Sequence, residues 1–218
     1  MSQIAVIVES DTSSPGGFIA DAATSRGFSL HRVQVNGRGE AFDQLPDPDI
    51  IVVTGSDEHW YEIDDHPHLQ AELAFLQRAI TRGTPILGLC FGGQGIAMAM
   101  GAEVKPMGLT EIGWHEVESR IPDLVPAGPW FEWHSDAFDL PTGAELVARN
   151  DVSLQAFRYG PHLGLQFHPE VGPEVLRPWI DHASEFGADP QTLMAETERL
   201  AGEARGRAFE LFDRFLGL

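Results

Sequence analysis

The chain has 218 residues, 43% hydrophobic and 22% charged, a composition typical of a globular protein with one substantial core. Its formal net charge of −19 argues against nucleic-acid or anionic-membrane partners, because phosphate groups would be repelled. The single cysteine, Cys90, excludes an internal disulfide and suits a reducing compartment.

The sequence contains neither a membrane-span pattern nor an export signal. No apolar run approaches the ~20 residues that cross a bilayer as a helix. The segment Met1–Glu9 has no basic flank and leads directly into a β-branched run, unlike a signal peptide. We therefore expect a cytoplasmic protein.

Strands and helices alternate along the first half of the chain. β-branched runs predict strands, and amphipathic stretches between them predict helices. Gly27 is suited to cap the end of the first helix, and Pro67 stands near the start of the second. The expected strands are 4–8, 30–35 and 49–54, the expected helices are 18–26 and 67–82, and a loop is expected at 37–48. This alternation favours a parallel, doubly wound sheet, whose ligands bind beyond the carboxyl ends of its strands.

Residues 84–95, T-P-I-L-G-L-C-F-G-G-Q-G, predict a sharp turn from a buried strand at 84–89 into a helix that starts at Gln94. Cys90 lies at the corner, flanked by glycines that let the backbone pass close on both sides. A thiol at a helix N-terminus is favoured as thiolate. The alternative is a small core cysteine beside a glycine-rich packing turn.

Residues 163–170, L-G-L-Q-F-H-P-E, alternate as a strand that ends at His168, where Pro169 has no N–H to donate. Glu170 follows two residues later. A histidine can take the thiol proton, and a carboxylate can hold the imidazole in the useful tautomer. Cys90, His168 and Glu170 thus form a candidate catalytic triad.

Together these segments resemble the class I, triad-type glutamine amidotransferases. G-L-C-F-G-G-Q at 88–94 is similar to their G-x-C-x-G-x-Q nucleophile motif, and Q-F-H-P-E at 166–170 is similar to their His-x-Glu motif. The resemblance covers roughly residues 4–172 and is strongest to the glutaminase domain of GMP synthase. It implies a flavodoxin-like α/β domain at 1–172, with residues 173–218 as a helical extension. It also implies hydrolysis of the glutamine side-chain amide through a γ-glutamyl thioester on Cys90, without a cofactor.

The turn after the third strand, T-G-S-D, is expected to face Cys90. The main-chain N–H groups of Gly55, Ser56 and Phe91 are candidates for an oxyanion hole. The family often has G-G-P-x-S here, so only the first glycine is kept. The alternative is a plain strand-ending turn.

The resemblance also places a substrate pocket at W-F-E-W-H-S-D, residues 130–136, which corresponds to the family's Ser-His-Gly-Asp segment. It implies that Gln94, Trp133, Ser135 and Asp136 line the pocket. Trp133 replaces a small polar residue, which raises the alternative of a different γ-glutamyl substrate. His134 is interpreted as a hydrogen-bonded structural histidine. Trp114 and His115 are expected on the same rim.

Residues 57–68 hold three histidines and five acids. Their spacing matches no recognised metal site, so a solvated loop is the favoured interpretation, and no metal site is predicted.

The second half predicts short strands at 102–105, 112–118, 144–149 and 153–158, including antiparallel additions to the sheet. A helix is expected over 174–185, interrupted early by Pro178. Asp189 and Pro190 predict the start of another helix, whose apolar stripe either packs on its own domain or docks a partner or second copy.

Three functions remain open. The first is a glutaminase that supplies ammonia to a separate synthetase subunit, since the sequence has no P-loop for ATP. The second is a hydrolase of other γ-glutamyl peptides or amides with the same triad. The third is a non-catalytic regulatory or binding member of the fold. A homodimer is also an open possibility.

Overall fold

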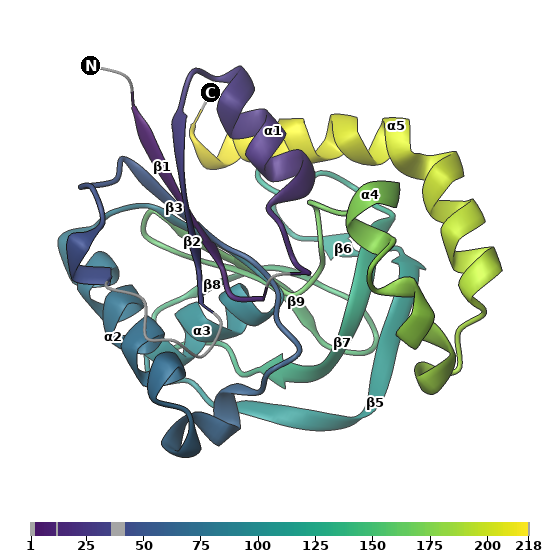
Figure 1. Cartoon of the computed structure of the whole chain (residues 1–218), viewed down its shortest axis with the longest axis horizontal. Coiled ribbons are helices and arrows are strands. Elements are labelled where there is room, and N and C mark those ends of the chain that lie inside the picture. Colours follow the sequence, from purple (N-terminus) through teal and green to yellow (C-terminus); the bar gives the residue numbers. More distant parts are fainter. Residues whose placement is uncertain (1–2, 12, 36–41, 218) are drawn as a thin grey trace.

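The computed structural model describes residues 3–11, 13–35 and 42–217 (Figure 1). At its centre is an eight-stranded sheet of order β2-β1-β3-β4-β10-β9-β8-β6. The strands β2, β1, β3, β4 and β10 pair in parallel, and the remaining pairs are antiparallel. Their bounds are β1 Ile4–Glu9, β2 Ser29–Gln34, β3 Ile50–Val53, β4 Ile86–Leu89, β6 Glu118–Ser119, β8 Glu145–Arg149, β9 Leu154–Tyr159 and β10 His162–Leu165. The predicted fold class, a mostly parallel sheet with antiparallel additions, is confirmed.

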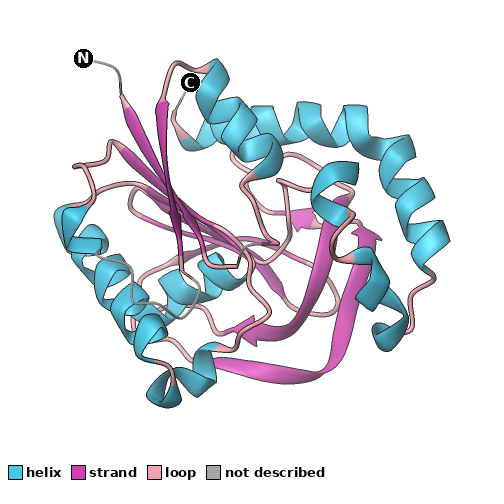
Figure 2. Cartoon of the chain, viewed as in Figure 1, coloured by secondary structure: helices cyan, strands magenta, loops and turns pink. Residues whose placement is uncertain are grey.

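Helices cover both faces of this sheet (Figure 2). On β1, Ala5 and Ile7 pack in one core cluster with α1 and α5, whereas Val6 and Val8 pack in another with α2 and α3. A parallel strand buried on both faces requires such a continuous apolar run. The helices and 3₁₀ turns on the two faces are α1 Gly17–Ser25, η1 Phe42–Gln44, η2 Trp60–Asp65, α2 Pro67–Arg82, α3 Phe91–Ala99 and α5 Pro190–Phe215. Among the described residues, no helix is long and apolar enough to span a membrane.

The structure shifts several predicted boundaries in the first half of the chain. Helix α3 begins at Phe91, three residues before the predicted start, so the helix follows Cys90 directly. The predicted loop at 37–48 lies partly outside the described residues, and its described part contains η1. The other predicted strands and helices of this half are confirmed to within two residues at each end.

The second half contains a long two-stranded ribbon that the sequence analysis missed. The separate strands predicted at 102–105 and 112–118 are wrong, because one strand, β5 Val104–His115, runs from the end of the first into the start of the second. Its pairing shifts register between Pro106 and Glu111, which explains the broken sequence pattern. Its antiparallel partner is β7 Trp130–Phe138. An isolated bridge between Phe131 and His168 links the ribbon to the chain that follows β10.

The C-terminal region packs against the body of the protein. The predicted interruption at Pro178 is confirmed, because α4 Pro173–Leu176 ends before it. The rest of the helix predicted to residue 185 is wrong, because the 3₁₀ segment η3 Ile180–Phe186 takes its place. Asp189 caps α5 as predicted, accepting a hydrogen bond of 2.8 Å from the Thr192 N–H. The predicted stripe is buried, and α5 lies beside α1, with an ion pair between Arg26 and Asp213.

The contact between α3 and β10 generates a stability prediction. A methyl group added at Gly93 would lie 2.1 Å from the Leu165 carbonyl oxygen, which is backbone and cannot rotate away. We expect Gly93→Ala to lower the free energy of unfolding by about 2 kcal/mol or more, measured by urea denaturation. The control is Gly202→Ala on α5, where a methyl group meets nothing within 4 Å and helix propensity favours alanine. Equal stability of the parent and Gly93→Ala would contradict the close packing.

Candidate active site

Cys90 occupies a strained corner between β4 and α3. Its φ of +50° makes it the one non-glycine residue with positive φ among the described residues. Such a conformation costs on the order of 1–3 kcal/mol and persists only where the surroundings enforce it. A methyl group at Gly88 would lie 2.5 Å from the Gly92 carbonyl, and one at Gly92 would lie 2.3 Å from the Val53 carbonyl. Backbone-to-backbone packing therefore sets the position of the sulfur.

Trp60, in η2, supports the first turn of α3 from the side. Its ring stacks on Phe91 at 4.6 Å, and its Nε1–H donates to the Phe91 carbonyl at 2.8 Å. Gly95 makes room, because a methyl group there would lie 2.6 Å from the indole. The sequence analysis missed this residue and treated 57–68 as a solvated loop, which is wrong at Trp60. The sequence did contain one sign of a buried side chain in this segment, which is a tryptophan among charged residues.

His168 and Glu170 lie together at the same corner, both buried. Nδ1 of His168 lies 2.7 Å from Oε1 of Glu170. The predicted strand end at His168 is wrong, because β10 ends at Leu165. The main-chain N–H of His168 instead donates to the Phe131 carbonyl at 2.8 Å, so β7 fixes the histidine.

The sulfur of Cys90 meets this imidazole in a buried, polar setting. Burial alone would lower the pKa of His168, but the charges of Glu170 and of the Cys90 sulfur outweigh it and hold that pKa well above its ordinary value. The Gln166 side-chain amide donates to the sulfur at 3.6 Å, and the Trp133 carbonyl lies 3.8 Å from it. The arrangement favours the protonated, imidazolium form of His168 beside the sulfur.

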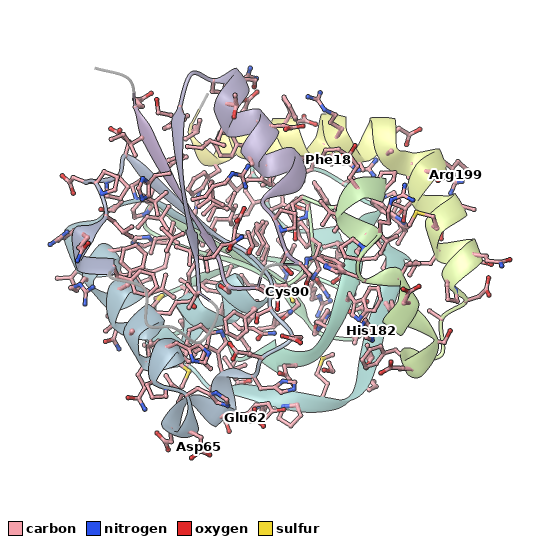
Figure 3. All side chains as sticks on the ribbon, viewed as in Figure 1. Phe18, Glu62, Asp65, Cys90, His182 and Arg199 are labelled. Carbon is pink, nitrogen blue, oxygen red and sulfur yellow. The ribbon has the colours of Figure 1, made fainter. Side chains whose placement is uncertain are left out.

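A cavity of ≈ 490 Å³ opens at Cys90. In Figure 3, Cys90 lies near the centre of the molecule, whereas Glu62 and Asp65 lie at its lower edge. All the site residues predicted from the sequence except Glu170 line this cavity: Gly55, Ser56, Cys90, Phe91, Gln94, Trp133, Ser135, Asp136 and His168. Glu170 lies behind His168, where its carboxylate reaches Nδ1.

One wall of the cavity carries the carboxylate of Asp136. Gln94 Nε2 donates to the main-chain carbonyl of Asp136 at 3.2 Å, which fixes that part of β7. Oδ2 of Asp136 lies 2.6 Å from His59 Nδ1. Oδ1 is buried and has no hydrogen-bond partner among the described residues. The wall can therefore accept hydrogen bonds from a cationic group of a ligand.

Aromatic side chains form another wall. Trp133 is turned into the cavity, with ring centroids 6.0 Å from Trp179 and 6.1 Å from Phe186. Two of these rings come from the segment 177–186, which the sequence analysis did not connect with the site. The spacing of the aromatic residues in 177–186 did not indicate a cavity wall, because aromatic residues at this spacing are common in packed helices.

Trp114 and His115, expected on the rim, do not line the cavity. Trp114 donates from Nε1 to Oγ1 of Thr197 at 2.9 Å, so the indole joins the ribbon to α5. His115 Nε2 bonds to the Ile112 carbonyl at 2.9 Å. Both are structural.

His134 is buried and held by polar groups, consistent with a structural role. Nδ1 lies 2.9 Å from the Asp136 carbonyl, and Nε2 lies 3.1 Å from Glu111 and 3.3 Å from Glu132. Burial opposes protonation, but the two carboxylates outweigh it and raise the pKa of His134 to about 10. Burial raises the pKa of Glu132 to about 7. This cluster supports β7 from the side away from Phe131.

Comparisons with known proteins find relatives of this chain. A γ-glutamyl-L-1-hydroxyisopropylamide hydrolase from a Pseudomonas species is 32% identical over 141 residues, which are 56% of this chain and 47% of that relative. A glutamine-hydrolysing GMP synthase from Thermomicrobium roseum is 35% identical over 146 residues, 61% of this chain and 26% of that relative. The chain thus spans less than half the length of these two relatives.

Solved structures and a family model extend the match along the chain. A glutamine amidotransferase from Thermotoga maritima superposes with a TM-score of 0.90 over 100% of both chains at 28% identity. One from Methylobacillus flagellatus shares the fold, with a TM-score of 0.87 at 23% identity over 100% of this chain and 95% of that one. The family model of glutamine amidotransferase class-I matches residues 13–180. The resemblance seen in the two sequence motifs is confirmed, and the chain belongs to the class-I glutamine amidotransferase family.

Proposed function

We propose that the protein hydrolyses the side-chain amide of glutamine, or of a related γ-glutamyl amide, through a thioester on Cys90. The observation that carries this proposal is the buried pair of Glu170 and His168 at the Cys90 corner, where Cys90 and His168 line the same cavity. Glu170 holds Nδ1, so Nε2 is the free nitrogen, and it has no hydrogen-bond partner among the described residues. That nitrogen is available for proton transfer in both halves of the reaction.

In the first half, the Cys90 thiolate attacks the amide carbonyl carbon. The oxyanion that forms is stabilised by main-chain N–H groups of Phe91, Gly55 and Ser56. The Phe91 N–H precedes the first hydrogen bond of α3, which Gln94 donates to the Cys90 carbonyl, so it is free of the helix ladder. His168 gives its Nε2 proton to the leaving nitrogen. The C–N bond breaks, ammonia leaves, and the γ-glutamyl thioester remains.

In the second half, His168 takes a proton from water as the water oxygen attacks the thioester carbonyl. The C–S bond breaks, glutamate forms, and the thiolate and imidazolium are restored. Asp136 is placed to bind the α-ammonium group through Oδ1, which has no hydrogen-bond partner among the described residues. Glycine at 55 leaves room for the imidazole, since a methyl group there would lie 3.0 Å from Cε1 of His168.

A second candidate is hydrolysis of γ-glutamyl amides with a larger leaving amine. The specific observation is the aromatic wall of Trp133, Trp179 and Phe186, which the departure of ammonia does not require. The Pseudomonas relative, by its name, acts on a γ-glutamyl amide of a small amino alcohol. We propose this substrate class as the alternative to glutamine.

We further propose that any released ammonia passes to a synthetase that is not part of these 218 residues. The support is that the match covers only 26% of the GMP synthase relative.

Replacing the nucleophile tests the mechanism directly. We expect Cys90→Ala to lower glutamate release at least about a thousandfold, because no other group in the cavity can form the thioester. The free energy of unfolding in urea should change little, since alanine lacks only the sulfur. Retained turnover in a folded Cys90→Ala protein would reject the thioester.

Glu170→Gln tests the coupling between carboxylate and imidazole. Loss of the negative charge should lower the pKa of His168, measured by NMR titration of its ring protons, and should reduce turnover. In the parent, the protonated imidazole stabilises the fold fully below about pH 6.5, and this contribution is lost as the pH rises through the raised pKa. The Glu170→Gln variant should lose most of this contribution to stability.

The matched control is Glu185→Gln. Glu185 pairs with the exposed His182 at 3.1 Å and should leave the pKa of His168 unchanged. A His168 pKa that is identical in Glu170→Gln and the parent would contradict the proposed role of Glu170.

Trp133→Ala separates the two substrate classes. If the indole binds the leaving amine, kcat/KM for γ-glutamyl amides with apolar amines should fall about 10- to 100-fold more than kcat/KM for glutamine. Leu109→Ala, an exposed leucine on the same ribbon, is the control and should change neither value. An equal fall for both substrates would reject the alternative and leave glutamine as the substrate.

A further inference from the structure

Two histidines and a glutamate converge beside the active-site cavity. Glu58 precedes η2, whereas His66 and His68 flank the start of α2. One ligand atom from each lies within 4.8 Å of the other two. Figure 3 shows Glu62 and Asp65, which belong to the intervening η2 segment, at the margin of the molecule, whereas Cys90 is at its centre. Within the cluster, Glu58 and His66 are partly exposed and His68 is buried.

The fold brings these side chains together in a way the sequence spacing does not suggest. Buried Trp60 fixes η2 against α3, so Glu58 is held close to the start of α2. Pro67 is the first residue of α2, which places His66 at the N-cap and His68 in the first turn. The linear spacing of 58, 66 and 68 matches no common motif, because a 3₁₀ turn lies between the ligands.

His68 and Glu58 already lie close enough for one cation to bind between them. Nε2 of His68 lies 2.7 Å and 2.8 Å from the two carboxylate oxygens of Glu58. His66 Nε2 is half-exposed and lies 3.9 Å from Oε2 of Glu62. A Zn²⁺ ion binds nitrogen and oxygen ligands at roughly 2.0–2.2 Å, so small side-chain rotations would admit it. Glu62 or a water molecule can take the fourth position.

The buried carboxylate of Glu72 lies near the cluster, and a nearby positive charge would stabilise it. Glu72 lies one helical turn after His68, is fully buried, and accepts a hydrogen bond of 2.9 Å from Ser10 on Oε1. Its Oε2 has no partner among the described residues. Burial, together with the charge of Glu58, raises the pKa of Glu72 to about 7. A divalent cation at Glu58 would oppose this accumulation of negative charge.

We propose that Glu58, His66 and His68 form a binding site for a divalent transition metal, with Zn²⁺ as the best fit. Two imidazoles and one carboxylate are typical ligands of Zn²⁺ and unsuited to Mg²⁺ or Ca²⁺. The cation would join the segment 56–59, which lines the cavity, to the start of α2. Its role is to hold that wall, and it takes no part in thioester chemistry.

The test is a Zn²⁺ titration of the full chain after treatment with a chelator. A cysteine thiolate can bind Zn²⁺ and would add a competing site, so the titration uses Cys90→Ala as the parent. We expect one Zn²⁺ per chain by isothermal titration calorimetry, and a rise in Tm with Zn²⁺ but not with Mg²⁺. Adding His66→Ala should weaken Zn²⁺ binding at least about tenfold, a loss no smaller than that from removing an outer-shell partner.

Two controls make the result specific. His31→Ala removes an exposed histidine on β2 and should leave Zn²⁺ affinity unchanged. His66 is itself half-exposed, so its removal should not alter the Tm without metal. Absence of saturable binding, or equal affinity in His66→Ala and its parent, would overturn the proposal. The second of these outcomes would direct attention to the buried group of Glu111, Glu132 and His134.

Discussion

The site depends on direct contact between the backbone of α3 and the backbones of two strands. Gly92 lies against the Val53 carbonyl of β3, and Gly93 lies against the Leu165 carbonyl of β10. A side chain at either position would push the helix away from the sheet, and the cysteine at its start would move with it. Interiors packed this closely respond to the addition of a single carbon. The left-handed backbone of Cys90 is therefore maintained by contacts that involve no catalytic side chain.

The ribbon of β5 and β7, which is separate from the eight-stranded sheet, completes the surroundings of Cys90 and His168. The ribbon of β5 and β7 supplies the carbonyl that holds the His168 main chain, and it also supplies part of the cavity lining. Beneath it, Glu111, Glu132 and His134 form a buried polar network, and such networks give a unique arrangement when their members are paired. Asp136 and His59 extend polar contacts to the far side of the cavity.

The sequence predicted those features that local chemistry determines. The β-branched runs of β1 and β3, Pro67 and Gly83 around α2, and the two motifs around Cys90 and His168 each specify structure within a few residues. The ribbon was missed because the register shift between Pro106 and Glu111 breaks its alternation. Trp60, Trp179 and Phe186 join the site only through tertiary packing, which no periodicity reports. The pairing of Glu58 with His68 depends in the same way on an intervening 3₁₀ turn.

The anchoring of the reacting groups by main-chain carbonyls has a consequence for how this scaffold can diversify. Phe131 and Trp133 offer their carbonyls to His168 and Cys90, whereas the Trp133 and Ser135 side chains on the same strand line the cavity. Exchange of those side chains alters the shape of the cavity without changing the main-chain atoms that contact Cys90 and His168. Under the proposed function, substrate selection and the placement of Cys90 and His168 thus depend on different atoms of one β-strand, so its side chains can change while the sulfur and the imidazole keep their positions.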